Sequence, residues 1–299
     1  MSKTLYSNVV GVDLAPSEFT ITARRLMSYA AALGATEDVY LNDLRPEGII
    51  GLPTFIISPE WRVMNGPAYR GVLGAGDEQM WRCIHVRQDS RLFAPLRPEQ
   101  RIVTKGKISV LRKTRIGAYI AVRLDTTLAD TGQDIAQSWF CGIFLGDDVA
   151  GGDRSIVEPP DVPTILNTDS LVISPEPYLT ISRALPHLYT EAADIWNPIH
   201  TERSAARGAG LDDTLLHGSC SWGAAGLQII RQFCGGDPAR LRRLGARMSG
   251  KALVGDSLFL RSQADPRPVA GGVEVLFDVV NAEGKPVLSD GIAEIASAL

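Results

Sequence analysis

The sequence predicts an α+β protein built from two halves, each with an antiparallel sheet wrapped around a central helix. Three observations support this prediction. Two series of β-branched, alternating segments run from Arg82 to Leu145 and from Leu241 to Ser297. A helical spacing of apolar residues precedes each series. A stretch at 146–169 that is rich in Gly, Asp and Pro separates the two halves.

The first half is expected to hold one helix and a curved sheet. Residues 17–34 carry apolar residues at helical spacing, with Ser17 as the cap and Gly34 as the stop. The Gly- and Pro-rich stretch that follows, 43–59, predicts a loop that enters a buried segment. Four consecutive strands predict an antiparallel meander: Arg82 to Arg87, Arg101 to Leu111, Ala118 to Thr127 and Asp134 to Leu145.

The second half repeats this outline. A short strand at 171–174 and a helical stretch within 178–193 come before a second helix at 219–233. That helix is almost uncharged on every side, so we expect it to be buried, with small residues that let a sheet approach closely. Strands are expected at Leu241 to Gly250, Ser257 to Gln263, Gly272 to Asn281 and Lys285 to Ser297. A helix followed by a meander, twice, is the double hot-dog arrangement.

A length of 299 residues allows one or two domains. The composition shift predicts an N-terminal hot-dog at 1–150, a linker at 151–169 and a C-terminal hot-dog at 170–299 that carries the functional site. Because hot-dog sheets expose an edge and a flat face, we expect a homodimer.

Composition excludes several classes of function. A net charge of -4, with 21% charged residues, gives no support for nucleic-acid binding. The longest apolar stretches, such as 138–145, are too short to span a bilayer, and the N-terminus lacks a signal-peptide pattern, which predicts a cytoplasmic protein without membrane contact. The four cysteines form no Cys-x-x-Cys pair, so we expect reduced, mostly buried thiols and neither a disulfide framework nor a zinc site.

The run Asn197-Pro198-Ile199-His200 is the main candidate for chemistry. Its proline takes the backbone out of helix and holds Asn197 and His200 in a fixed turn. His217-Gly218 follows, and a glycine that opens a helix offers an unobstructed backbone N–H to a developing oxyanion. These residues predict a polar pocket for acid/base chemistry beside a carbonyl group.

Asn197-Pro198-Ile199-His200 followed by Leu216-His217-Gly218 resembles the signature of MaoC-like dehydratases, the (R)-specific enoyl-CoA hydratase group. Residues 178–299 carry the resemblance well, and the first half resembles the family's degenerate N-terminal hot-dog more weakly. The resemblance implies water addition to C3 of an enoyl thioester of CoA or a carrier protein, with a proton going to C2 and no metal or other cofactor. It makes His200 the family histidine, Asn197 its orienting asparagine and Gly218 the oxyanion-hole glycine.

The sequence departs from the family at the catalytic acid. The family's aspartate stands five residues before its histidine, where this chain has Ile195, and Asp194 stands one residue earlier. Three alternatives follow: Asp194 takes the role through a shifted loop, Glu191 or Glu202 replaces it, or hydration is lost. Water addition needs a base and an acid, and isoleucine can serve as neither.

Other residues have both a functional and a structural interpretation. Trp196 and Ser219 are candidates for substrate binding, and Arg243 and Arg247, with Lys251 nearby, are candidates for gripping the phosphates of CoA. A solvated basic face is the structural alternative for the arginines. His217 is expected to brace the motif loop, and Trp222 to fill the core.

The sequence therefore predicts a MaoC-like hydro-lyase acting on an enoyl or 3-hydroxyacyl thioester. A specialised lyase, isomerase or cyclase on the same fold is the first alternative. The second is a non-catalytic acyl-thioester binder or partner subunit.

Overall fold

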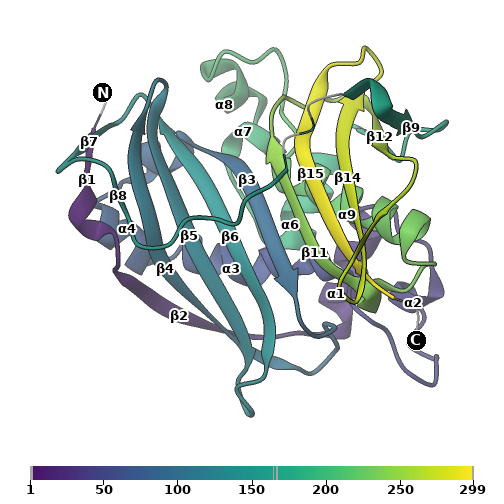
Figure 1. The fold of residues 1–299 in the computed structure, drawn as a ribbon. Helices are drawn as coiled ribbons and strands as arrows, with labels where there is room; N and C mark the ends of the chain where they lie inside the picture. Colours follow the sequence, from purple (N-terminus) through teal and green to yellow (C-terminus); the bar gives the residue numbers. More distant parts are fainter. Residues whose placement is uncertain (1–2, 164, 166–167, 298–299) are drawn as a thin grey trace.

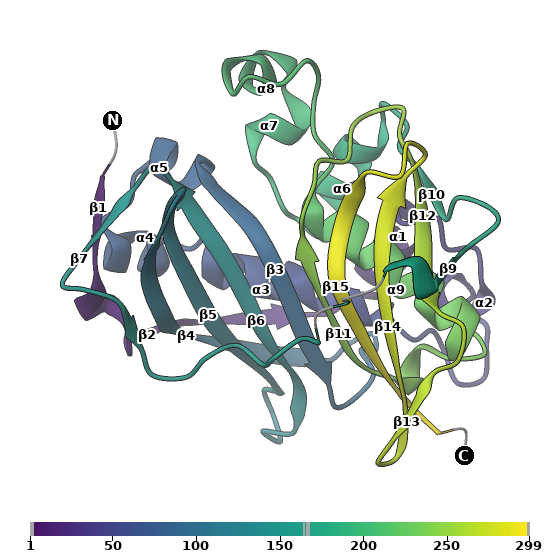
Figure 2. The ribbon, with the colours of Figure 1, turned by 45° about the horizontal axis from the view of Figure 1, so that its top comes forward.

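The computed structural model describes residues 3–163, 165 and 168–297, and one 13-stranded sheet runs through both halves of these residues. Figures 1 and 2 show most of the helices packed on one face of this sheet. The largest cluster of buried apolar side chains draws on both halves, so their cores are continuous. The predicted α+β class is confirmed.

The first half contains more helix than the sequence predicted. Its strands are β1 (Thr4–Tyr6), β2 (Asp13–Thr20), β3 (Cys83–Leu92), β4 (Arg101–Thr114), β5 (Gly117–Leu128), β6 (Asp134–Leu145), β7 (Asp148–Ala150) and β8 (Arg154–Ser155). Its helices are η1 (Ser7–Val9), α1 (Ala23–Ala32), α2 (Asp38–Leu41), η2 (Pro53–Ile56), α3 (Ile57–Met64), α4 (Pro67–Leu73) and α5 (Asp77–Trp81).

The second half follows its predicted order. Its helices are η3 (Thr168–Ser170), α6 (Leu185–Ala193), α7 (Pro198–Thr201), α8 (Arg203–Gly208), α9 (Gly218–Phe233) and η4 (Pro238–Arg240). Its strands are β9 (Leu171–Ile173), β10 (Leu179–Thr180), β11 (Leu241–Met248), β12 (Ser257–Gln263), β13 (Arg267–Val269), β14 (Gly272–Asn281) and β15 (Pro286–Ala296). The predicted bounds of β12 and β14 match the structure.

The helix predicted for 17–34 is shorter than expected. Ser17 is not its cap, because residues 13–20 form β2 and pair with β4. Thr22 caps α1 instead, its side chain accepting a hydrogen bond from the Arg25 backbone N–H. Gly34, with φ of 82°, follows the end of the helix as predicted.

A plain meander is the wrong description of either sheet half. The strand order β3-β6-β5-β4-β2 puts β3 beside β6 rather than beside its sequence neighbour β4. The order β12-β14-β15-β11 likewise puts β11 beside β15. The first strand of each predicted meander therefore closes against the last one, which leaves β3 and β11 free to pair with each other.

The antiparallel pairing of β3 with β11 joins the two halves. At this junction Asp89, buried on β3, receives two hydrogen bonds from the buried guanidinium of Arg243 on β11, at 2.9 and 2.8 Å. Gly245 lies opposite Asp89 in the ladder, and a Cβ there would come within 2.8 Å of the Asp89 carboxylate. The ion pair thus fits into space that a glycine leaves open.

Helix α9 lies in the common core, as its uncharged sequence predicted. Trp222 is 1% exposed, which agrees with the prediction that it fills the core. A Cβ at Gly226 would lie 2.8 Å from side-chain atoms of both Leu244 on β11 and Thr54 in η2. Small residues on α9 therefore let the sheet and the first-half helices approach it closely.

The segment after β6 crosses the sheet face opposite the helices (Figure 1). Strand β8 pairs with β4, and Arg112 forms an ion pair with Glu158 at 3.1 Å. Arg243 donates a hydrogen bond to the Asp161 carbonyl at 3.1 Å.

The division of the chain into domains at 151–169 stays a prediction, and Thr164, Leu166 and Asn167 of that linker lie outside the described residues. No helix in the described part is long and apolar enough to cross a membrane.

Candidate active site

A cavity of about 380 Å³ lies between the two halves, beside the start of α9. Three of the chain's four histidines line it: His85 from β3, His200 from α7 and His217 just before α9. Among the described residues that line the cavity, none is an aspartate or a glutamate. The described residues also hold no cluster of three or more His, Cys, Asp or Glu that could bind a metal.

Asn197 shapes the loop that presents His200. Its backbone is extended, and its side-chain oxygen accepts a hydrogen bond from the Ile199 N–H at 3.2 Å, which caps the short helix α7. Pro198 occupies the first position of that helix, where its missing N–H costs nothing. Asn197 lines the cavity, and the hydrogen bond that its side chain makes is this capping bond.

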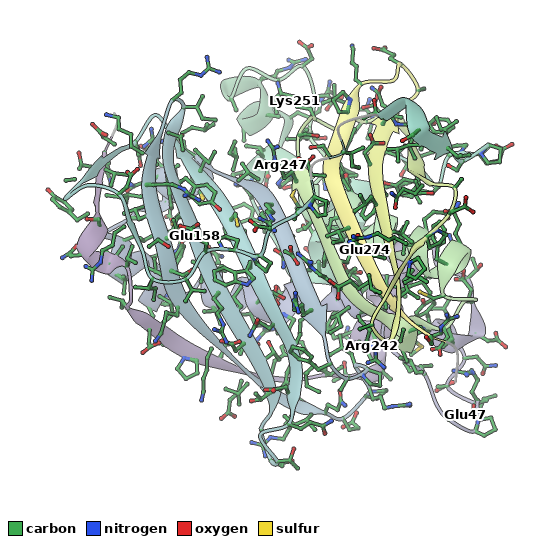
Figure 3. All side chains as sticks on the ribbon, viewed as in Figure 1. Glu47, Glu158, Arg242, Arg247, Lys251 and Glu274 are labelled. Carbon is green, nitrogen blue, oxygen red and sulfur yellow. The ribbon has the colours of Figure 1, made fainter. Side chains whose placement is uncertain are left out.

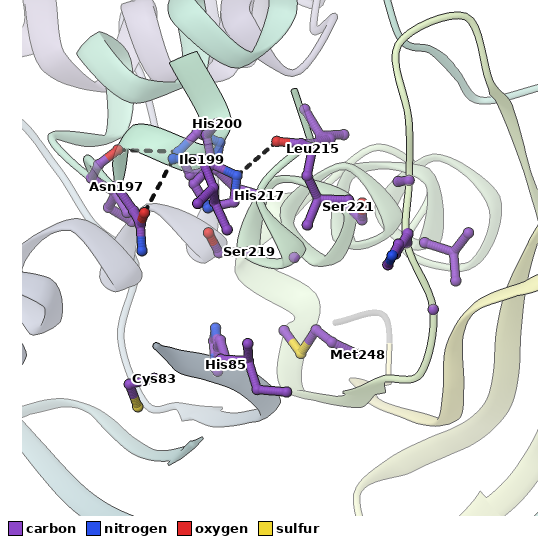
Figure 4. A pocket seen from close by; sticks show the side chains of 18 of the residues that line it. Cys83, His85, Asn197, Ile199, His200, Leu215, His217, Ser219, Ser221 and Met248 are labelled. Atoms are coloured by element: carbon purple, nitrogen blue, oxygen red, sulfur yellow. Dashed lines mark hydrogen bonds between the residues drawn. The ribbon is translucent and has the colours of Figure 1, made fainter. Parts of the chain in front are cut away.

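His200 is held with one nitrogen fixed and the other available. Its Nδ1 lies 2.7 Å from the Leu215 carbonyl oxygen, which can only accept, so Nδ1 carries the hydrogen and Nε2 carries the lone pair (Figure 4). Burial lowers the pKa of His200 to about 4. The ring is therefore neutral at pH 7 and can act as a proton acceptor through Nε2.

His217 stacks on His200, with ring centroids 3.7 Å apart. Its Nε2 lies 3.2 Å from the Ile195 carbonyl oxygen and 3.3 Å from the Thr190 hydroxyl, so its ring ties the start of α9 to the motif loop. Burial, and after it the neighbouring His200, lower the pKa of His217 well below its usual value. His217 therefore braces the motif loop, as the sequence predicted.

The first turn of α9 brings backbone N–H groups to the cavity. The N–H groups of Cys220 and Ser221 bond to the His217 carbonyl, whereas those of Gly218 and Ser219 stand before the first intrahelical bonds. Both Gly218 and Ser219 line the cavity. A Cβ at Gly218 would lie 2.7 Å from the Met248 side chain, so this glycine also permits close packing.

The structure does not place Asp194 in the site. Asp194 ends α6 in the left-handed conformation, with φ of 58°, and its side chain is half exposed. It forms ion pairs with Arg62 at 2.9 Å and Arg25 at 3.5 Å. Both arginines belong to the first half, so Asp194 ties the two halves together and does not line the cavity.

The other acids considered from the sequence also lie outside the cavity. Glu191 is exposed on α6. Glu202 is exposed and accepts a hydrogen bond from the Thr201 hydroxyl. Ile195, 5% exposed, lines the cavity at the position where the resemblance expects the aspartate. The site therefore has an apolar side chain in place of its expected carboxylate.

Most of the predicted substrate-binding residues do not reach the cavity. Trp196 is 48% exposed and donates a hydrogen bond to Thr201 instead. Arg243 is buried in the β3–β11 junction, and Arg247 pairs with Asp290 at 2.9 Å. Lys251 lines the cavity, close to Arg247 and at the other end of β11 from Arg242 (Figure 3).

His85 is the site residue that the sequence did not reveal. Its Nε2 lies 2.9 Å from the Arg87 carbonyl oxygen, and its ring stacks on Phe140 with centroids 4.3 Å apart. Burial lowers the pKa of His85 to about 4. Figure 4 shows it on the opposite side of the cavity from His200 and His217. A single histidine in a strand, far from the motif, gave no local signal.

Comparisons with known proteins agree with this architecture. Residues 172–270 match the family described as MaoC like domain, and residues 19–146 match the MFE-2 hydratase 2 N-terminal domain. A probable enoyl-CoA hydratase 2 from Dictyostelium discoideum is 24% identical over 292 residues, covering 96% of this chain and 95% of that protein.

Solved structures show the same fold. A MaoC-like dehydratase from Phytophthora capsici superposes with a TM-score of 0.79 at 19% identity, covering 96% of each chain. A Mycobacterium tuberculosis protein described as having a double hotdog fold gives a TM-score of 0.64 at 12% identity, again over 96% of each chain. The chain is thus a double hot-dog protein. It carries an MFE-2 hydratase 2 N-terminal domain followed by a MaoC-like dehydratase domain.

Proposed function

We propose that this chain is a hydro-lyase that adds water reversibly to an enoyl thioester. The arrangement of His200 beside the first turn of α9 carries the proposal. The His200 ring offers an unprotonated Nε2, and Gly218 and Ser219 begin a helix whose free N–H groups suit a developing oxyanion. The enoyl-CoA hydratase name of the Dictyostelium relative supports the same substrate class.

The chemistry can proceed through a single imidazole. His200 Nε2 takes a proton from water while the water oxygen bonds to C3, and the electron pair of the C2–C3 double bond moves toward the thioester oxygen. The N–H groups of Gly218 and Ser219 stabilise that oxygen. The His200 imidazolium then returns its proton to C2, so one water is added and the histidine is regenerated.

Purified protein tests this proposal with crotonyl-CoA and longer trans-2-enoyl-CoA substrates. We expect loss of the enoyl absorbance with the wild type and a rate at least about 100-fold lower with His200→Ala. His187→Ala is the matched control, because His187 is exposed on α6 and does not line the cavity. Normal turnover by His200→Ala would remove His200 from the mechanism.

The carboxylate-free lining favours one alternative, an isomerase or lyase that moves a proton without adding water. Such a reaction needs a base and an oxyanion site, both of which the cavity offers. Product formation from an unsaturated thioester with no hydration across a panel of acyl chains would favour this alternative.

The thioester carrier and the assembly state are further parts of the proposal. Lys251 is a cationic side chain at the cavity and is suited to a phosphate of CoA or of a carrier-protein arm.

We also propose a cytoplasmic homodimer, as the sequence suggested. The β3–β11 pairing already satisfies one edge of each half inside a single chain, so a dimer would form through other surfaces.

A further inference from the structure

The carboxylate-free cavity raises the question of what holds the second hydrogen of the reacting water. A water molecule that gives one proton to His200 still has a second O–H group, which is a hydrogen-bond donor. In a buried site that group needs an acceptor, because an unsatisfied hydroxyl is costly. Ile195, at the position expected for an acid, offers none. The acceptor must therefore be another polar group that lines the cavity.

His85 meets the chemical requirement. The Arg87 carbonyl oxygen 2.9 Å from Nε2 can only accept, so Nε2 carries the hydrogen and Nδ1 carries the lone pair. Stacking on Phe140 fixes the plane of the ring. The Gln88 side chain also hydrogen-bonds to the ring, but both of its amide hydrogens go to other side chains, so it does not donate to the Nδ1 lone pair. The ring lies across the cavity from His200 (Figure 4). His85 and His200 are thus two oriented acceptors on opposite walls.

We propose that His85, contributed by the first half, accepts a hydrogen bond from the reacting water and later from the 3-hydroxyl group of the product, in the place of the missing aspartate. This inference rests on the proposed hydro-lyase function. His85 gains and loses no proton in the cycle: His200 carries the transferred proton, and His85 orients the oxygen that bonds to C3. The active site then requires both halves of the chain.

Kinetics in the two directions test this role. In hydration, water is the group that His85 contacts, so His85→Leu is expected to lower kcat about tenfold and leave the KM for crotonyl-CoA unchanged. In dehydration the contacted group belongs to the substrate, so the same variant is expected to raise the KM for 3-hydroxybutyryl-CoA several-fold. His85→Gln, which keeps an acceptor, should recover part of both losses, and His187→Leu should change neither.

A second measurement does not depend on a variant. In wild-type protein with isotope-labelled histidine, the imidazole signals of His85 and His200 should both shift when 3-hydroxybutyryl-CoA is added, while His187 stays unchanged. Two results would overturn the proposed role. One is a shift of the His200 signals without a shift of the His85 signals. The other is that His85→Leu lowers kcat equally in both directions and leaves both KM values unchanged. Wild-type protein that neither turns over these thioesters nor shows a shift at any histidine would overturn the proposed function itself.

Discussion

Asp194 and Ile195 are neighbours in the chain, yet their side chains go opposite ways. The left-handed backbone at Asp194 ends α6 and turns its carboxylate toward Arg62 and Arg25. Ile195 then takes the position that lines the cavity, and its carbonyl oxygen lies next to the His217 ring. A displacement of one residue therefore turns a potential catalytic acid into an ion pair between the halves.

Ile195→Asp is expected to raise the hydration rate. It places a carboxylate in the cavity at the position expected for the family acid, where it can bind and polarise water with His200. We expect an increase in kcat of about tenfold or more for crotonyl-CoA. Ile195→Asn is the control, since it has a similar shape and no acid. Equal rates in the two variants would show that the position does not limit the chemistry.

The pH profile should differ from that of an ordinary histidine enzyme. Burial lowers the pKa of His200 to about 4 from 6.5, so its Nε2 stays unprotonated down to about pH 5. We expect the acid limb of kcat/KM to fall near pH 4 to 5. Folding disfavours the protonated ring, so stability from this group is present above pH 6.5 and is lost as pH falls toward 4. A limb near pH 6.5 would contradict a buried, neutral His200.

At the scale of elements, α9 depends on glycine for its packing. Gly226→Ala is expected to destabilise the protein by about 1–3 kcal/mol, because the new Cβ would meet Leu244 and Thr54 at 2.8 Å. Gly71→Ala in α4 is the matched control. A Cβ at Gly71 meets open space, so that change should be neutral or stabilise by up to about 1 kcal/mol. Chemical denaturation of both variants measures the difference.

Elements with a local signal were predictable from the sequence, and those fixed by distant partners were not. Helix α9 and strands β12 and β14 follow their apolar patterns almost to the residue. The segment 17–20 has helical spacing but pairs with β4, so a long-range ladder overrides its local preference. Helices α2 to α5 were missed because each is only four to eight residues long, too short to show a clear helical period.

At the scale of the whole molecule, the Asp89–Arg243 ion pair holds the two halves together. Asp89→Ala would leave the buried Arg243 guanidinium with Glu294 as its remaining acidic partner. We expect a loss of about 3–5 kcal/mol of unfolding free energy. Asp130→Ala, which removes an exposed pair with Arg101, should cost less than about 1 kcal/mol. Similar losses in both variants would show that the junction pair is not special.

The candidate site was predictable only on the side that the motif encodes. Asn197, His200 and Gly218 line one cavity, as expected from a single loop followed by a helix start. His85 reaches the same cavity only because β3 pairs with β11 across the two halves, and no local pattern encodes that pairing. Arg243 belongs to a basic run in the sequence, yet its partner Asp89 lies in the other half, so its burial could not be foreseen.

The antiparallel pairing of β3 with β11 joins the first strand of one predicted meander to the first strand of the other, as an isologous contact between two identical units would. In a symmetric dimer of identical chains, every pocket at such an interface would have a symmetry-related copy, and any substitution would alter both pockets. A fused chain removes that constraint. One half can keep the reactive loop while the other evolves as the opposing wall, so substrate choice and reactivity can change through separate mutations.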